Sequence, residues 1–457
     1  MTLIRSCLLL LCCGISVVLW AQSDPFLDGT FSDTITTEAA PIADSLQHEW
    51  SWSADILLFS RTNEFAKKVG TINPDNRVAE LSDYDMGLYL RPKLRYQLNK
   101  DRELFGLWVQ PRLNMEVDLS NATLTEDDYD MEFYFQELKA KFQINKSLYV
   151  MGGRYLKEMG TSIFINPSNP FILDPGRINP KIEQRPMDFV ELNYSTEKSW
   201  EFALFANVYK GENFHYDFPY FDFERSYGLL ADYYGDALNI GLVSMFDEGG
   251  KVHLGSNGQA NLTEALVVYN DLAFIRKPNR FYPVNGHWTD PQLLEYDMIN
   301  GSKNDQFFFH GLVGLSYTTL LGPTVSLEYY YNGLGYDEEE AELLQEQIAH
   351  SSTYNFDVTK DLANINLARS INPGILYNRR HYLFSSIGDT DVWGQLDYNL
   401  RYVASFEDQS HQLSALTEWR FGNFEAFAVL LFNFGGRDTD LNRLLDRVAM
   451  LGVIYRM

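Results

Sequence analysis

The feature that most constrains this fold is a strict alternation of apolar and polar residues over unusually long runs. In the segment 83–98 every second residue is apolar, from Tyr84 and Met86 to Tyr96 and Leu98, and most residues between them are charged or polar. Successive side chains of a strand point to opposite faces, so the segment predicts a strand with one apolar and one charged wall. The run covers some 16 residues, whereas strands of soluble domains average about 5–6 residues.

The same pattern recurs along the chain, for example at 106–119 and 392–402, and indicates about 18 strands. Their expected spans are 50–61, 82–98, 103–119, 129–144, 147–157, 187–196, 199–209, 225–234, 236–247, 251–259, 263–276, 306–320, 322–334, 379–387, 391–406, 409–420, 423–435 and 446–457. The links after even-numbered strands are tight, and those after odd-numbered strands are often long. This alternation is typical of an up-and-down antiparallel β-barrel with short periplasmic turns and long outer loops. A 16-stranded barrel and a large soluble β protein are the alternatives.

The N-terminus predicts export. All three cysteines lie in the first 21 residues, together with a single arginine and an apolar run that ends near Ala21. This layout is that of a signal peptide, over residues 1–21. The polar segment 22–48 lacks strand periodicity and predicts a flexible periplasmic extension, which leaves 49–457 for the barrel. The remainder contains no apolar run of the roughly 20 residues that a membrane helix needs.

The composition narrows the partners. The chain carries 37 Lys and Arg against 62 Asp and Glu, a formal net charge of −25. Nucleic acid is therefore not an expected partner, because phosphate binding needs a basic surface. Aromatic residues make up 15% of the chain, which favours a folded protein over a disordered acidic one.

Two local motifs resemble known outer-membrane proteins. Gly452, Tyr455 and Met457 resemble the C-terminal insertion signal that the barrel assembly machinery reads. The tract from Gly153-Arg154 through Gly160 to the Asn-Pro pairs at 166–167 and 169–170 resembles porin-like outer-membrane proteins, with Met159 in the place of their tryptophan. The resemblance implies a place in the Gram-negative outer membrane, contact with its lipid and lipopolysaccharide, and a long loop that folds inward. Trimers are common among such porins, which leaves a homotrimer open.

The charged wall predicts the lining of a pore. On the expected register one face of the first strands carries mostly basic side chains, which would set a transverse field and select ions. Any water-filled barrel also needs a polar interior, which is the simpler explanation for each residue alone. The predicted pore-lining residues are Arg91, Lys93, Arg95, Arg112, Glu116, Lys139, Lys141 and Arg154.

Two long loops are candidates for shaping the pore. The loop after the fifth strand holds four prolines between 167 and 180, which fix φ and remove backbone donors. We expect it to form part of a constriction, with Asn166, Asp174 and Arg177 as candidate residues; an ordered outer loop is the alternative. In the loop 335–378, the acidic segment 337–350 predicts a helix that caps the barrel or lies in an outer loop.

The sequence contains no pattern typical of an enzyme or a metal site. His310, Ser316, Ser326 and Glu328 lie on neighbouring strands, but no G-x-S-x-G or H-E-x-x-H motif occurs. The acidic clusters at 126–128 and 337–340 lack the spacing of a Ca²⁺ loop and are better explained as solvated acids. We therefore expect no catalysis, no cofactor and no bound metal.

The function that best fits these patterns is passive diffusion of small hydrophilic solutes or ions through a porin-like channel. A closed barrel that binds or anchors surface polysaccharide is the alternative, because the aromatic-rich outer loop at 214–223 would suit sugar stacking. A polysaccharide exporter is intermediate between the two. The sequence does not decide whether the lumen is open.

Overall fold

The computed structural model describes residues 47–65, 67, 70–98, 104–120, 125, 128–171, 183–184, 186–209, 224–278, 280–283, 306–353, 357–371, 377–436 and 439–457. The predicted signal peptide and most of the predicted extension lie outside these residues. The first strand begins at His48, two residues before the expected first strand.

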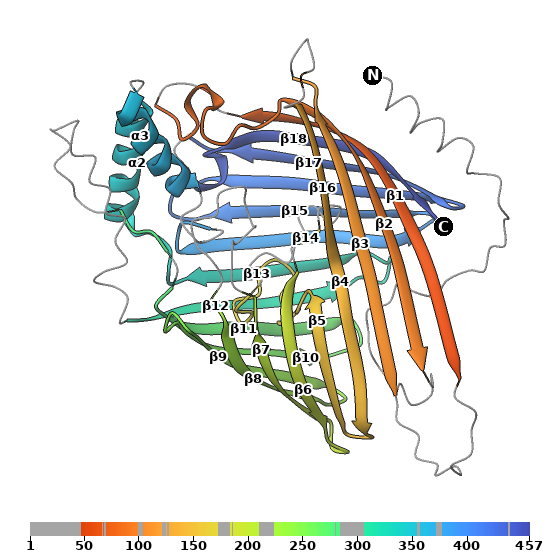
Figure 1. The fold of residues 1–457 in the computed structure, drawn as a ribbon. Coiled ribbons are helices and arrows are strands. Elements are labelled where there is room, and N and C mark those ends of the chain that lie inside the picture. The colour runs from red at the N-terminus through yellow and green to blue at the C-terminus, as the bar shows by residue number, and fades with distance from the viewer. Residues whose placement is uncertain are drawn as a thin grey trace. The chain divides into compact units, whose positions relative to one another are not determined.

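The described strands form one closed antiparallel sheet (Figure 1). Each strand pairs with its neighbours in the sequence, and β1 pairs with both β2 and β18, which closes the barrel. The strands are β1 (His48–Phe65), β2 (Tyr84–Leu98), β3 (Phe105–Asp118), β4 (Tyr129–Asn145), β5 (Leu148–Tyr155), β6 (Met187–Ser195), β7 (Trp200–Asn207), β8 (Ser226–Tyr234), β9 (Leu238–Asp247), β10 (Val252–Asn261), β11 (Leu266–Arg276), β12 (Phe307–Thr318), β13 (Thr324–Asn332), β14 (His381–Val392), β15 (Leu396–Ser405), β16 (His411–Phe421), β17 (Phe424–Phe434) and β18 (Leu445–Arg456).

The predicted fold class is confirmed, because each of the 18 expected strands is present within a few residues of its expected span. The alternation of links is confirmed too. Links such as 146–147 and 422–423 follow even-numbered strands, and links such as 156–186 and 333–380 follow odd-numbered ones. The largest differences in strand boundaries are at the β14–β15 turn, where β14 ends at Val392 and β15 begins at Leu396, each five residues later than expected, and where the ladder shifts between Asp389 and Val392.

The two faces of the wall differ as the alternation predicts. In β2, Asp85, Gly87, Tyr89 and Arg91 are buried toward the barrel interior. The residues of the other parity face outward with their neighbours on β1 and β3. Large apolar side chains therefore cover the outer surface at Trp52, Met86, Leu94, Phe133, Leu204 and Leu242. Such a surface requires a hydrocarbon environment.

Two facing prolines interrupt the ladder as expected. The β2–β3 pairing passes from Leu90↔Leu113 to Leu94↔Val109 without pairs between them, at the level of Pro92 and Pro111. On the other side of β3, the pairing with β4 shifts between Gln110 and Pro111. Proline cannot donate to a ladder, so a bulge forms beside it.

Two helices lie in the connection between β13 and β14. They are α2 (Glu338–Ser352) and α3 (Asp357–Ile371), with short 3₁₀ turns η1 (Pro74–Asn76) and η3 (Asp440–Asn442) in two other links. The acidic segment thus forms the predicted helix, and Asp337 caps it in a capping box with Glu340. No helix among the described residues is long and apolar enough to cross a membrane.

The helices belong to a small core made by four links on the long-loop side. Ile72 and Val78 from the β1–β2 link pack with Leu344 of α2 and Leu367 of α3. Arg77 of the β1–β2 link donates from Nε to Asn364 of α3 at 2.9 Å. The long links therefore form packed structure at this end of the barrel.

Candidate functional site

The inner wall of β1–β4 carries paired charges. Arg61 binds Asp85 at 2.9 Å, Lys93 lies 3.2 Å from Asp55, and Lys139 lies 2.6 Å from Glu137 on its own strand. Tyr89 donates to Glu116, which is also 3.5 Å from Arg61. These positions place the predicted residues Lys93, Glu116 and Lys139 on the interior face.

Arg91 and Arg112 meet a carboxylate that sequence reasoning did not single out. Glu183, in the link between β5 and β6, accepts from Arg112 at Nε (2.5 Å) and Nη2 (2.7 Å), a bidentate pair. Its carboxylate also lies 3.8 Å from Arg91. Burial acts to raise the pKa of Glu183, but the hydrogen bonds from Arg112 and the charges of Arg91, Arg112 and Lys93 outweigh it and lower that pKa below its usual range. The loop therefore brings a fixed negative charge onto the basic wall.

Aromatic rings separate other cations of this wall. The Arg95 guanidinium lies 5.3 Å from the Trp108 ring, and Lys139 Nζ lies 5.1 Å from the same ring. Lys141 Nζ lies 4.6 Å from the Tyr149 ring. These cation–π contacts orient the side chains along the wall.

Arg154 is a correction to the predicted lining. The register sets it opposite Leu138 of β4 and Asp188 of β6. Leu138 is exposed on the outer face, and Arg154 shares that face. There Arg154 makes a bidentate pair with Asp188 at 2.7 and 2.8 Å. Lys139 faces the interior and pairs with Gly153, so the next residue, Arg154, lies on the other face of the wall.

On the inner wall opposite β2 and β3, Glu328 of β13 contacts the loop after β5. This carboxylate is fully buried and accepts from Ile163 N (2.7 Å), Ser162 Oγ (3.0 Å) and Tyr269 Oη (2.8 Å). Phe164 of the loop stacks on Phe384 of β14, with ring centroids 5.0 Å apart. The loop segment 162–164, which is far from β13 in the sequence, is therefore held against β13 inside the barrel.

Asp271 of β11 holds the same loop at a second point. Its buried carboxylate accepts from Ser168 N at 2.5 Å, from Ser168 Oγ at 3.0 Å and from Thr161 N at 3.2 Å. His253 Nε2 of β10 lies 3.1 Å from the Ser168 carbonyl oxygen. Because carboxylates accept strongly from backbone N–H groups, this arrangement fixes the loop backbone.

The start of the loop is anchored nearby. Lys157 and the Tyr155 hydroxyl both bind Glu191 of β6, at 2.6 and 2.5 Å. Asn166, one of the predicted constriction residues, is buried, and its side chain accepts from Ser162 N at 3.0 Å within the loop. The structure therefore gives Asn166 a role in the loop's own turn. Asp174 and Arg177 lie outside the described residues.

The described parts of this loop thus contact opposite sets of strands. Residues 156–171 contact β6, β10, β11, β13 and β14, whereas Glu183 contacts β2 and β3. Glu183, Glu328, Asp271 and Glu191 were not among the predicted site residues. In the sequence each of them is an acid at an inward-facing strand position or in the loop. Such a position does not reveal which residue the acid binds.

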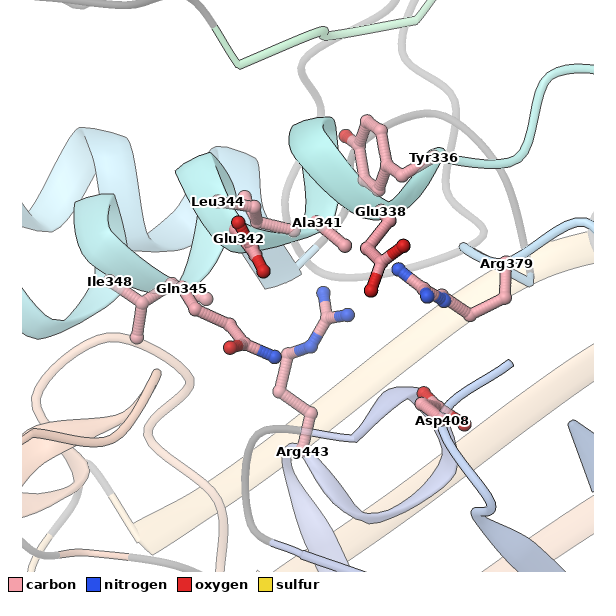
Figure 2. Close-up of a pocket in the computed structure, with 10 residues that line it drawn as sticks. All are labelled: Tyr336, Glu338, Ala341, Glu342, Leu344, Gln345, Ile348, Arg379, Asp408 and Arg443. Atoms are coloured by element: carbon pink, nitrogen blue, oxygen red, sulfur yellow. The ribbon is translucent and has the colours of Figure 1, made fainter. Parts of the chain in front are cut away.

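A separate pocket lies along one side of α2, between Glu338 and Ile348 (Figure 2). It measures about 90 Å³, and the guanidinium groups of Arg379 and Arg443 point into it toward the acidic face of the helix. Solute sites usually have volumes of about 300–1,000 Å³, so this gap is too small for one. Among the described residues no group of three or more His, Cys, Asp or Glu could hold a metal ion.

His310 and Ser316 do not form a catalytic pair in the described structure. His310 Nδ1 is 3.0 Å from the Tyr330 hydroxyl, and Ser316 Oγ is 3.0 Å from Ser326 Oγ on the next strand. Both serines lie two or more register positions away from His310. The polar groups of this wall bind one another.

The closed 18-stranded barrel with an apolar outer face and a loop inside it defines an outer-membrane β-barrel. Solved structures of Pseudomonas aeruginosa outer-membrane proteins share this fold. OccK5 (OpdH) aligns with a TM-score of 0.53 at 11% identity, over 90% of this chain and 98% of its own. OpdK solved with vanillate gives 0.52 at 11%, over 89% and 98%, and OpdQ gives 0.52 at 10%, over 90% and 99%.

No protein-family model matches the sequence, and no curated protein matches it either. At these identities the structural similarities show the fold, and they confirm the expected resemblance to porin-like outer-membrane barrels. The outer membrane is accordingly the location that the barrel fits.

Proposed function

We propose that this protein is a porin-like channel through which small hydrophilic solutes or ions diffuse passively. The observation that carries the proposal is the loop after β5, which contacts two opposite inner walls. We infer that a loop held in this way narrows the lumen and leaves a path through it. The outer surface that faces lipid and the charged inner surface fit the same function.

We expect a local preference for anions in the part of the interior near the short turns. On the inner wall of β1–β4 and the adjoining loop, nine acidic side chains face seven basic ones, and four of the basic ones, Lys93, Arg95, Lys139 and Lys141, lie toward the short-turn end. Most of the basic side chains are paired, which reduces the field that a passing ion meets. The basic set is Arg61, Arg91, Lys93, Arg95, Arg112, Lys139 and Lys141, and the acidic set is Glu49, Asp55, Asp85, Glu116, Asp118, Asp130, Glu132, Glu137 and Glu183.

The test is a reversal-potential measurement in a KCl gradient across a planar lipid bilayer. The wild-type barrel is expected to conduct in discrete steps, and the double variant Arg95→Gln, Lys141→Gln should shift its reversal potential toward cation preference. Arg225→Gln is the matched control, since Arg225 is an exposed residue of the β7–β8 link that lies 4.0 Å from Glu248. Absence of current from correctly folded protein would favour the closed barrel that binds or anchors polysaccharide.

A solute test can follow the same recording. OpdK was solved with vanillate, so vanillate and an uncharged analogue of equal size are suitable probes. We expect the aromatic rings and cations near Trp108 to slow the anion more than the neutral analogue. Equal blocking by both would remove the role assigned to the cations.

The partners remain part of this proposal. Insertion through the barrel assembly machinery rests on the C-terminal motif, and contact with lipopolysaccharide rests on the apolar outer face. A homotrimer rests only on the resemblance to porins. Chemical cross-linking in the membrane distinguishes a trimer from a monomer.

A further inference from the structure

A row of aromatic and histidine rings crosses the outer face of the barrel at its long-loop end. Phe274, Phe309, Tyr331 and His381 lie on consecutive strands β11–β14, and successive ring centroids are 5.1, 6.1 and 5.2 Å apart. On β15 and β16, Tyr402 and His411 continue the row, with centroids 5.7 Å apart. Aromatic rings at such a level mark a membrane boundary.

The two histidines of the row are held in the same way. The Tyr329 hydroxyl lies 2.6 Å from Nδ1 of His381, and the Tyr402 hydroxyl lies 2.8 Å from Nδ1 of His411. A hydroxyl that donates to Nδ1 leaves the proton of a neutral imidazole on Nε2. Within the described part of the chain, neither Nε2 has a hydrogen-bond partner. In that tautomer, with the tyrosine hydroxyl as donor, each ring offers one N–H donor from Nε2 on the outer surface.

The level of these donors fits the lipid headgroups. A second set of outward rings lies at the short-turn end, where Trp50 and Tyr96 are 4.5 Å apart and Phe424 and Tyr455 are 4.9 Å apart. Strand β16 runs from His411 to Phe421. With the usual rise and tilt, a strand of this length spans about 25 Å, the height of the apolar band of such barrels.

The charged side chains beside the row do not form a basic patch that would attract an anion. Glu407 lies beside the row, where its carboxylate accepts from the backbone N–H groups of Arg380 and His381 at 2.5 and 3.2 Å. Arg380 is 3.2 Å from Asp337. The groups of the row that can bind an acceptor are therefore the Nε2–H groups of His381 and His411.

We propose that His381 and His411, oriented by Tyr329 and Tyr402, bind phosphate groups of the phosphorylated glycolipid in the outer leaflet. The phosphate oxygens are the strong acceptors at that level, and hydrogen bonds to charged acceptors are the stronger kind. The histidines lie on strands separated by one strand, at a lateral spacing of about 10 Å. Two phosphates can therefore be bound side by side. The site faces lipid and does not depend on an open lumen.

The test is native mass spectrometry of the full purified barrel with added lipid A. The variant His381→Phe, His411→Phe keeps the ring stacking and removes both donors. We expect it to retain bound lipid A about tenfold less well than the wild type, as the loss of hydrogen bonds to a charged group implies. Dephosphorylated lipid A should bind both proteins equally. His48→Phe is the matched control, because His48 makes the same pair with Tyr96 (2.6 Å) at the short-turn end.

Three results would overturn the proposal. They are unchanged retention of lipid A by the double variant, an equal loss of the dephosphorylated lipid, and displacement of the lipid by millimolar inorganic phosphate. The last would identify a site for free anions. If the double variant fails to fold, Tyr329→Phe with Tyr402→Phe provides the test. It keeps the histidines, frees their tautomer and should weaken retention by a smaller factor.

Discussion

The two inner walls that contact the loop after β5 hold it by opposite means. On β2 and β3 the wall supplies cations, Arg91 and Arg112, and the loop supplies the carboxylate of Glu183. On β11 and β13 the wall supplies carboxylates, Asp271 and Glu328, and the loop supplies mainly backbone N–H and serine groups. The first contact is an ion pair with a partly exposed acid, and the second is a set of buried hydrogen bonds.

This difference separates the two contributions of the loop. Buried carboxylates that satisfy several donors fix backbone position, because an unsatisfied buried donor costs about 1–3 kcal/mol. An ion pair near water contributes less to stability but sets the local charge. We therefore expect substitutions on the β11–β13 side to change where the loop lies, and substitutions on the β2–β3 side to change selectivity.

The largest effect is expected from Glu328→Ala. The change leaves the donors of Ser162, Ile163 and Tyr269 without their acceptor, so the free energy of unfolding should fall by about 3 kcal/mol or more. Urea unfolding in lipid vesicles measures this. Tryptic cleavage at Arg177 should also become faster if the loop is released. Unchanged stability together with unchanged cleavage would show that this contact does not hold the loop.

A smaller effect of the same kind is expected from Asp271→Asn. The amide keeps one oxygen to accept from Ser168 or Thr161 but places an NH₂ group against another donor. We expect a loss of about 1–2 kcal/mol in the same unfolding assay. A loss as large as that of Glu328→Ala would contradict the ranking of the two carboxylates.

Glu183→Gln should alter selectivity with little change in stability. The variant removes a negative charge and keeps a hydrogen-bonding group beside Arg112, so the basic wall becomes less neutralised. The reversal potential in a KCl gradient should move toward anions, while unfolding changes by less than about 1 kcal/mol. A strong loss of stability with unchanged selectivity would reverse the roles of the two walls.

The smallest effect is expected from moderate acid. The pKa of Glu183 is lowered, so its ion pair is fully present above the ordinary glutamate value of about 4.3 and is lost only as the pH falls through the lower folded value. Selectivity attributable to Glu183 should therefore stay constant from neutral pH to about 4.5. Reversal potentials of the wild type and of Glu183→Gln, compared across this range, isolate the part of the selectivity that depends on the Glu183 charge. If the two proteins became equally selective already above pH 5, the assigned direction of the pKa shift would be wrong.

Much of the fold follows from the sequence because a barrel wall has a simple rule. Period-two alternation gives the strands, and link lengths give the up-and-down order, so β2 and β3 agree with their expected spans. The prolines at 92 and 111 even locate the irregularity. Beyond that bulge Lys139 and Lys141 still face inward, and the hairpin register pairs Gly153 with Lys139, so Arg154 lies on the opposite face.

The interior contacts were beyond the reach of the sequence. Glu328 meets Ile163 across a separation of 165 residues, and no local pattern couples an acid on a strand to backbone amides of a distant loop. That Lys93, Lys139 and Lys141 line a pore stays a prediction, and their pairing with acids and rings depends on the register between strands. That pairing is what decides the charge that a passing solute meets.

The most direct test of the account is single-channel conductance of the wild type beside Glu328→Ala in the same planar bilayer. We expect discrete openings from the wild type and a larger or noisier conductance from the variant, because the loop that we propose to narrow the lumen loses its main attachment. Equal conductance from both folded proteins would show that the loop does not narrow the path. Absence of conductance from both would contradict the channel itself.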